Sequence, residues 1–541
     1  MGKRNLYLKT ISLEEALEKY EKALEKVLTK KWETIPVTES LGRVTKEAVY
    51  AKYCSPLYNS AAMDGIGVIT EKTKGATQTS PVELVQGEDF VPVDTGDPVH
   101  LPYDGVIMAE DLLETDKEDR VRITEAAAPW QHIRPVGEDI VAGEMILPGH
   151  HKIRAIDIGV LLSAGITEIS VACRPSVAIF PTGTEMIEPG ETPVEGSIIE
   201  SNSRMFENMA KEQGAEAVRF PILPDDYDTI RDAVARAAKE YDMVVINAGS
   251  SAGREDYTVH VLRELGEVIV HGVAVKPGKP VILAVVNNRP VIGLPGYPVS
   301  AYIAFENFVS PVLAKMGDFP QEKKPVIHGV VTKRLVSSLK HREYVRVKVG
   351  KVGDKLVAAP LARGAGAAMS LVRADGFCII PQNSEGLEAG EEAEIELYRD
   401  LSQIENTLVI IGSHDLILDI MADLMPQIHP GMFISSTHVG SMGGLTALKR
   451  QEAHIAPVHL LDETTGVYNE SYLKKMFREP MVLIKGVGRI QGLMVKPGNP
   501  LGITGISDLR KGRYVNRQRG AGTRILLDYL LGKEGISPDE I

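Results

Sequence analysis

The spacing of apolar residues predicts a helix near the start of the chain. Ser12 is followed three residues later by Glu15, and apolar side chains then recur at helical spacing. This is the pattern of an amphipathic helix that begins with a capping box. We predict a helix over residues 12–30, closed by the positive charge of Lys30 and Lys31 at its C-terminal end.

The next hundred or so positions change to short β-type runs punctuated by glycine and proline. Closely spaced short strands of this kind predict a compact β domain, which we place at residues 51–144. The β domain interrupts a helical linker domain formed by residues 1–50 and 145–175. Within the linker domain the pattern predicts a helix over 156–165 and a strand over 168–171.

Residues 176–322 alternate between apolar strands and amphipathic helices. The predicted helices cover 203–213 and 229–240, and the predicted strands are 176–180, 217–220, 243–246, 281–285 and 290–294. Apolar strands separated by helices imply a parallel sheet buried on both faces. Ligands of such sheets lie beyond the carboxyl ends of the strands.

The remaining chain predicts two further domains. Residues 323–400 are β-rich and predict a small barrel, and residues 400–405 form a polar linker. A strand at 408–412 ends in a glycine turn and starts a new α/β pattern over 405–541. The fold class is therefore multidomain α/β plus β, with a central parallel α/β domain, two small β-rich domains, a helical linker domain and a C-terminal α/β lobe.

Composition and charge exclude several classes of protein. The 541 residues are 44% hydrophobic and 25% charged, with a net charge of −13, which disfavours a general nucleic-acid binder. Cys54, Cys173 and Cys378 lie far apart without a CxxC spacing, so they predict reduced thiols and no metal site. No signal peptide and no apolar window of about 18 residues is present. We expect a cytoplasmic protein with no nucleic-acid or membrane partner.

Five short segments carry candidate chemistry. They are Asn59-Ser60-Ala61-Ala62-Met63-Asp64-Gly65, Pro181-Thr182-Gly183-Thr184-Glu185, the glycine-bearing loop that leads to Asp256, Lys276-Pro277-Gly278-Lys279-Pro280, and Pro295-Gly296-Tyr297-Pro298-Val299-Ser300. Taken singly, each is a turn that contains a carboxylate, a lysine or a helix start. Asp256 could equally cap a helix that begins near Tyr257, and Asp64 could belong to an ordinary Asp-Gly turn.

Together and in this order, the segments resemble the molybdopterin molybdenumtransferase family (MoeA and the E domain of gephyrin-like proteins). The resemblance covers about residues 10–400. It implies binding of adenylylated molybdopterin together with molybdate or tungstate and Mg²⁺. The adenylate would be cleaved and the oxyanion transferred to the dithiolene, giving molybdenum cofactor and AMP. It also implies a homodimer.

The resemblance assigns roles to individual residues. It implies five catalytic positions, namely Asp64, Thr95, Glu185, Asp225 and Asp256, of which Glu185, Asp225 and Asp256 hold the metal. Carboxylates suit this task because Mg²⁺ prefers oxygen ligands. It implies seven substrate- or oxyanion-binding positions, namely Lys276, Lys279, Pro295, Pro298, Ser300, Arg342 and Ser370. Ammonium groups and the free N–H groups of a helix start suit an oxyanion.

Some positions depart from the family pattern. They are Arg254, Gly272, Tyr297 and Ala365, the last within a loop that has lost hydroxyls before Ser370. These departures leave the carboxylates in place but leave the geometry of the oxyanion pocket open. The choice between molybdate and tungstate is also open.

The chain beyond residue 405 resembles a periplasmic-binding-protein-like domain. The residues that carry this resemblance are Gly412-Ser413-His414-Asp415, the segment 438–444, His459-Leu460-Leu461-Asp462 and the segment 517–524. It implies that an oxyanion or pterin is held by Ser413, Ser441, Thr523 and Arg524. The alternative is a set of strand-to-helix turns without a ligand. We expect the domain to be incomplete, because a second lobe needs on the order of 60–100 further residues.

Two other functions stay open on the sequence. A pterin- or oxyanion-binding sensor without turnover is compatible with the departures in the oxyanion loop, whereas retention of the four carboxylates argues against it. A gephyrin-like scaffold would leave the acidic residues without a task. We therefore favour the transferase.

Overall fold

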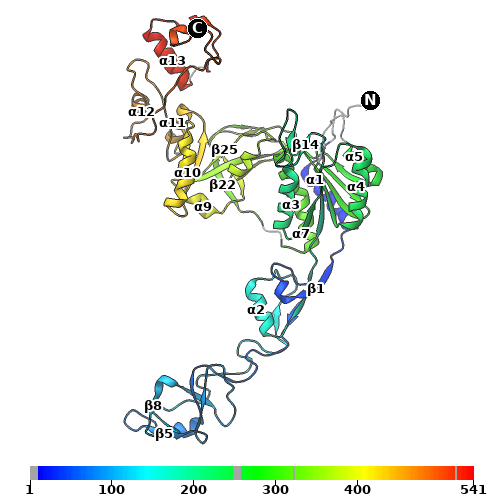
Figure 1. Cartoon of the computed structure of the whole chain (residues 1–541), viewed down its shortest axis with the longest axis vertical. Coiled ribbons are helices and arrows are strands. Elements are labelled where there is room, and N and C mark those ends of the chain that lie inside the picture. The colour runs from blue at the N-terminus through cyan, green and yellow to red at the C-terminus, as the bar shows by residue number, and fades with distance from the viewer. Residues whose placement is uncertain (1–9, 248–256, 321–322, 518–520) are drawn as a thin grey trace.

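The computed structural model describes residues 10–247, 257–320, 323–517 and 521–541, and it shows an elongated molecule (Figure 1). A β domain with strands β5 (Val82–Val85) and β8 (Leu112–Glu114) lies at one end, and helix α13 (Gly522–Lys533) lies at the other. An α/β domain and a β-barrel lie between them. Among the described residues, no helix combines the length and apolar character needed to cross a membrane.

Helix α1 spans Leu13–Leu24 and is shorter than predicted at its C-terminal end. The interpretation of the two following lysines as helix-closing charge is wrong. Lys30 pairs with Asp318, and Lys31 Nζ lies 2.6 Å from a carboxylate oxygen of Asp242. Both partners belong to the α/β domain, so these lysines tie the start of the chain to that domain.

The linker region is held together by strands from distant parts of the chain. Strand β1 (Trp32–Pro36) pairs antiparallel with β12 (Glu168–Ala172), and β2 (Val49–Tyr50) pairs with β11 (Met145–Leu147). Helix α2 (Ala155–Ser163) packs beside them. The predicted helix and strand of this region are confirmed.

The inserted β domain contains two small sheets and a two-stranded pair, β3 (Ser60–Ala61) with β10 (Ile133–Arg134). The strands of the two sheets are β4 (Gly65–Val68), β6 (Phe90–Val93) and β7 (Gly105–Met108), and β5, β8 and β9 (Arg120–Ile123). The glycine after Asp64 is required by packing. A Cβ atom on Gly65 would lie 2.0 Å from the carbonyl oxygen of Ile107 on the neighbouring strand.

The α/β domain is built on a six-stranded sheet. Its strands, in spatial order, are β16 (Glu216–Arg219), β13 (Ser176–Pro181), β17 (Met243–Asn247), β21 (Arg289–Leu294), β20 (Ile282–Val286) and β18 (Gly266–His271). The first four are parallel, but β20 and β18 run antiparallel to their neighbours. The prediction of a fully parallel sheet is wrong at this edge. Asn287 and Asn288, both at positive φ, join β20 to β21 in a two-residue turn that is too short for a crossover.

Helices cover both faces of the sheet. Helices α1, α3 (Asn202–Glu212), α6 (Pro298–Ala304) and α7 (Ser310–Gly317) share one core, and α4 (Tyr227–Glu240) and α5 (Thr258–Leu265) share the other. The sheet is therefore buried on both sides, as its uniformly apolar strands predict.

The predicted barrel is confirmed. Its strands are β22 (Val326–Val331), β24 (Arg342–Val352), β25 (Lys355–Pro360), β26 (Gly376–Ile380) and β28 (Glu392–Leu397). The sheet closes because β24 pairs with both β25 and β26. Residues 401–405 form helix α9 rather than a simple polar linker, because Ile404 is buried in the barrel core.

The C-terminal α/β region packs directly on the barrel. Strand β29 (Thr407–Gly412) pairs parallel with β30 (Phe433–His438). Helix α10 (Leu416–Ile428) connects the two strands, and helix α11 (Ser441–Lys449) follows β30. Val409 of β29 shares an apolar cluster with Val352 and Val357 of the barrel. The two regions therefore have a common core.

Candidate functional site

The loops that follow β13 and β16 meet beyond the carboxyl edge of the sheet. The backbone N–H of Thr184 donates to a carboxylate oxygen of Asp225 (3.2 Å), and the N–H of Asp225 donates to the Thr184 hydroxyl (3.3 Å). Glu185 follows directly and is exposed. The structure thus brings the loops of Glu185 and Asp225 side by side. The neighbouring Asp226 instead caps helix α4.

Asn247, which the sequence analysis missed, ties this edge together. Its carbonyl accepts a hydrogen bond from the N–H of Thr182 (3.0 Å), and its buried side-chain amide donates to the carbonyl of Pro295 (2.9 Å). The available signal was a polar residue directly at the end of an apolar strand. Asp256 and Arg254, which follow Asn247 in the sequence, lie outside the described residues.

Two of the predicted metal-binding carboxylates, Glu185 and Asp225, lie on neighbouring loops of this edge. Among the residues that the structure describes, no group of three or more His, Cys, Asp or Glu side chains could hold a metal ion. Mg²⁺ is commonly held by one or two carboxylates together with substrate phosphates and water. Glu185 and Asp225 fit that donor set.

A cationic cluster lies where the α/β domain meets the barrel. Strand β19 (Val275–Lys276) pairs with β24 and places Lys276 opposite Glu343. The Glu343 carboxylate is 3% exposed, and its Oε1 lies 3.6 Å from Lys276 Nζ and 3.1 Å from Arg363 Nε. Arg363 was also missed. Its only sequence signal was its position before the Gly-Ala loop of the barrel.

The predicted oxyanion residues around this cluster divide into two groups. Burial lowers the pKa of His341, and the positive charges of Lys279 and Lys276 lower it further. Arg342 points elsewhere, because its Nη1 lies 2.9 Å from a carboxylate oxygen of Glu14 on helix α1. Oxyanion binding by the two lysines and by Arg342 stays a prediction.

Helix α6 joins the cationic cluster to the carboxylate edge. It begins at Pro298, and the N–H of Val299 donates to the carbonyl of Ala365 in the barrel loop (3.0 Å). Ser300 is buried, and a Cβ atom on Gly278 would lie 3.4 Å from its carbonyl oxygen. The Lys-Pro-Gly-Lys turn therefore packs on this helix.

Ser370 is occupied by contacts within the barrel. Its hydroxyl accepts a hydrogen bond from Nε of the buried Arg346 (2.9 Å) and donates to the carbonyl of Ala367 (2.5 Å). These bonds shape the loop above helix α6. A direct role of Ser370 in oxyanion binding stays a prediction.

Asp64 and Thr95 form a pair in the inserted β domain. The Thr95 hydroxyl (2.7 Å) and backbone N–H (2.6 Å) both donate to one oxygen of Asp64, which lowers the pKa of that carboxyl. The β domain lies apart from the α/β domain (Figure 1). Within one chain, the pair therefore does not reach Asp225.

Three consecutive family models match the chain between residues 11 and 398. Residues 11–165 match the MoeA N-terminal region (domains I and II), 178–315 a probable molybdopterin binding domain, and 328–398 the MoeA C-terminal region (domain IV). A molybdopterin biosynthesis protein of Methanocaldococcus jannaschii is 34% identical over 385 residues, which are 68% of this chain and 93% of that protein. The chain belongs to the MoeA family.

Other members of the MoeA family agree with this assignment. Molybdopterin molybdenumtransferase 2 of Mycobacterium tuberculosis is 30% identical over 390 residues, covering 67% of this chain and 94% of the relative. The crystal structure of a MoeA protein from Pyrococcus horikoshii superposes with a TM-score of 0.60 at 31% identity, over 72% of this chain and all of that one. The described fold up to the barrel is thus a MoeA fold.

The region that extends this MoeA chain matches a PBP superfamily domain over residues 422–541. There the Ser441 hydroxyl accepts a hydrogen bond from the N–H of His459 (3.1 Å). The His459 ring also lies against Gly522 at the start of α13, where a Cβ atom would come within 2.5 Å of it. Ser441 and the first turn of α13, which contains Thr523, therefore border the same histidine.

The two other predicted C-terminal residues have different surroundings. Ser413 is buried, and its N–H donates to the carbonyl of Pro457 (2.9 Å). Arg524 pairs with Asp528 one turn later on α13 (2.8 Å). Ligand binding by these four residues stays a prediction.

Proposed function

We propose that this protein inserts molybdate or tungstate into adenylylated molybdopterin, with release of AMP and with the help of Mg²⁺. The names of its relatives support this transfer reaction. The observation that carries the proposal is the continuous rim from the Thr184–Asp225 bridge, through Asn247, to helix α6 and the Lys276 cluster. Along this rim, carboxylates that suit Mg²⁺ are followed by lysine ammonium groups that suit an oxyanion.

The residues divide the work by charge. Glu185 and Asp225 would hold Mg²⁺, with Asp256 as the further predicted ligand, and bound Mg²⁺ neutralises charge on the phosphoryl oxygens. Lys276 and Lys279 orient the incoming oxyanion, because their ammonium groups border one turn. Asn247 holds the loop that contains Glu185 next to the segment before helix α6, because it bonds to both Thr182 and Pro295.

We also propose that the enzyme acts as a two-fold dimer in the cytoplasm. The support is the position of the Asp64–Thr95 pair, whose exposed carboxylate is held ionised far from the rest of the site. A second copy can present this pair to the carboxylate edge of the first. The site would then be complete only in the dimer.

Adjacent aspartates provide a matched test. Cofactor formation and AMP release are measured from adenylylated molybdopterin, molybdate and Mg²⁺ for the parent, Asp225→Asn and Asp226→Asn. We expect Asp225→Asn to lower the rate roughly 100-fold or more, as loss of an electrostatic group in an active site does. Asp226→Asn keeps a good helix cap and should retain the parent rate. Equal rates in all three would contradict the proposed role of Asp225.

The same assay separates the second candidate, a pterin- or oxyanion-binding sensor. The observation that favours a sensor is the core shared by the barrel and the C-terminal region, through which binding in one could affect the other. Tight pterin binding without AMP release in the parent protein would support the sensor and reject the transferase.

A further inference from the structure

A large cavity lies at the opposite edge of the α/β sheet from the carboxylate loops. It has a volume of about 890 Å³ and is bordered by the linker domain, helices α3 and α7, and the barrel. Arg174 and Gly214, which line it, precede the starts of β13 and β16. The cavity is therefore separate from the site of the proposed transfer reaction, which lies past the ends of those strands.

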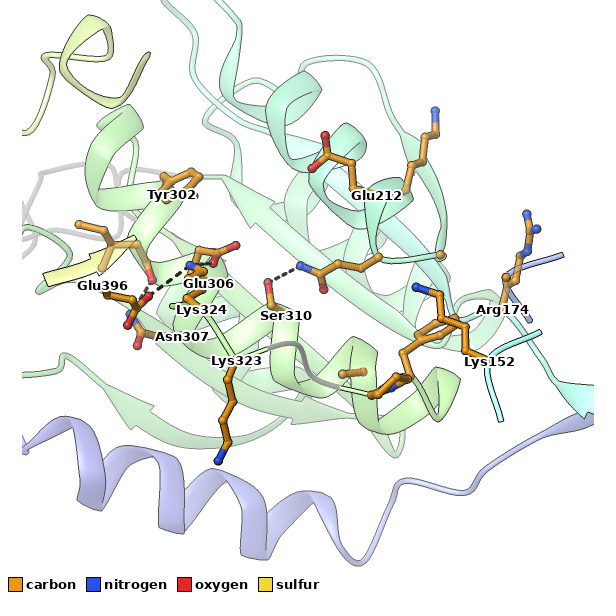
Figure 2. Close-up of a pocket in the computed structure, with 18 of the residues that line it drawn as sticks. Lys152, Arg174, Glu212, Tyr302, Glu306, Asn307, Ser310, Lys323, Lys324 and Glu396 are labelled. Carbon is orange, nitrogen blue, oxygen red and sulfur yellow. Dashed lines mark hydrogen bonds and ion pairs between the residues drawn. The ribbon is translucent and has the colours of Figure 1, made fainter. Parts of the chain in front are cut away.

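Backbone pairing gathers three cationic side chains from the linker domain at one end of the cavity. The N–H of Ile153 donates to the carbonyl of Arg43 (2.8 Å), and Arg43 Nη2 donates to the carbonyl of Ala172 (2.6 Å). These bonds bring Lys152 and Arg174 next to each other. Figure 2 shows both side chains at the same end of the cavity.

A fourth cation comes from the α/β domain. The N–H of Glu216 donates to the carbonyl of Pro175 (2.8 Å), which joins the start of β16 to the segment that contains Arg174. Lys211, in the last turn of α3, borders the cavity at this point. It also pairs with Glu207 one turn earlier (2.7 Å).

Arg43 pairs with Glu33 and Lys211 pairs with Glu207, whereas the other two cations stay unpaired within the described part of the chain. Lys152 and Arg174 are exposed, and neither forms an ion pair with any residue in the described part of the chain. Arg43 is 7% exposed, and its buried Nε has no hydrogen-bond partner there. In a chain with a net charge of −13, a concave cationic surface concentrates the local field and attracts small anions.

The other end of the cavity is aromatic and close to neutral. The ring centroids of Tyr302 and Phe377 lie 6.2 Å apart. Lys323 borders this part of the cavity, and the neighbouring Lys324 pairs with Glu306 and lies 3.4 Å from a carboxylate oxygen of Glu396. Figure 2 shows the side chains of Lys324, Glu306 and Glu396 grouped together. A ligand that matches both ends has a localised negative charge and a planar apolar part.

We propose that this cavity binds a small organic phosphate. Lys152, Arg174 and Lys211 hold the phosphate group, and the planar part faces the aromatic end. The cavity volume is within the range of about 300–1,000 Å³ that is usual for small-molecule sites. Three lysine or arginine side chains around one hollow are also a common donor set for phosphate.

Pyridoxal 5′-phosphate is the probe for the first experiment, because it joins a phosphate and a planar ring to an aldehyde that reacts with lysine. Its imines are fixed with borohydride and located by peptide mass spectrometry. We expect Lys152 or Lys211 to be labelled about tenfold faster than Lys239, an exposed lysine on α4. Pyridoxal, which lacks the phosphate, should show no such preference. Even labelling of the lysines by both compounds would overturn the proposal.

A charge reversal that removes no labelled group provides the second experiment. Arg174→Glu should slow labelling of Lys152 and Lys211 about tenfold, whereas Arg236→Glu on the far helix α4 should not. Labelling of Lys276 should be the same in both variants, which reports an intact protein. AMP should protect at lower concentration than inorganic phosphate. Equal protection by the two, or normal labelling in Arg174→Glu, would refute an organic phosphate site.

Discussion

The charge on Glu343 is predicted to stabilise the junction between the α/β domain and the barrel. Glu343→Gln keeps the shape of the side chain and its hydrogen bond with Ser337 (2.9 Å), but it leaves Arg363 and Lys276 without their counter-ion. Breaking a fully buried pair costs about 3–5 kcal/mol. The side chains of Arg363 and Lys276 are 34% and 52% exposed, so water screens their charges. We therefore expect Glu343→Gln to lower the free energy of unfolding by about 1–2 kcal/mol.

Thermal unfolding followed by calorimetry and circular dichroism measures this effect. The loss corresponds to a fall of about 2–8 °C in the unfolding midpoint. Glu388→Gln is the matched control, because Glu388 pairs with Arg334 on the exposed surface of the same barrel and should cost about 0.5 kcal/mol or less. The double variant Glu343→Gln/Arg363→Met should recover part of the loss. An unchanged midpoint in Glu343→Gln, or a double variant that loses the sum of both effects, would refute the reasoning.

Three further predictions concern other contacts. In Gly350→Ala the new methyl group would lie 2.1 Å from the Val409 side chain. We expect this clash to lower the free energy of unfolding by about 1–3 kcal/mol and to speed proteolysis between the barrel and the C-terminal region. An unchanged rate of digestion would contradict this. Burial acts to raise the pKa of Asp318, but hydrogen bonds from a lysine and a histidine outweigh it and leave that pKa below its usual value. The stabilising effect of the ionised Asp318 is therefore complete above about pH 4 and is lost as pH falls through the native pKa. The urea midpoint should consequently fall less steeply below about pH 4 in Asp318→Asn than in the parent protein. An equal slope in the two proteins would count against this prediction. Thr95→Val removes the hydroxyl that holds the pKa of Asp64 low, and an NMR titration should show that pKa rising; no change would mean that the hydroxyl bond is not made in solution.

Patterns within short segments predicted much of the fold. The apolar run at 243–246 became β17, and the amphipathic run at 229–240 became part of α4. The same approach failed where connection length mattered, since Asn287 and Asn288 leave no room for a crossover and reverse the next strand. Strand identity depends on neighbouring side chains, whereas strand direction depends on the link between strands.

The candidate site was predicted only as far as its motifs were local. The alternation of strands and helices predicted a site beyond the carboxyl ends of the strands, which is where the loops of Glu185 and Asp225 meet, although the catalytic role of both residues stays a prediction. Arg363 and Asn247 had no motif of their own. Their importance comes from what they touch, and those partners are distant in the sequence.

By itself, the sequence determined which segments are helices and strands, which family the chain resembles, and where charged turns follow apolar strands. These properties depend on residues within one or two turns of each other. Only the tertiary structure decided that Lys30 pairs with Asp318, 288 residues away, and that the cations at 43, 152, 174 and 211 border one cavity. Such contacts depend on how whole domains pack, because an ion pair between distant residues forms only after the chain between them has folded.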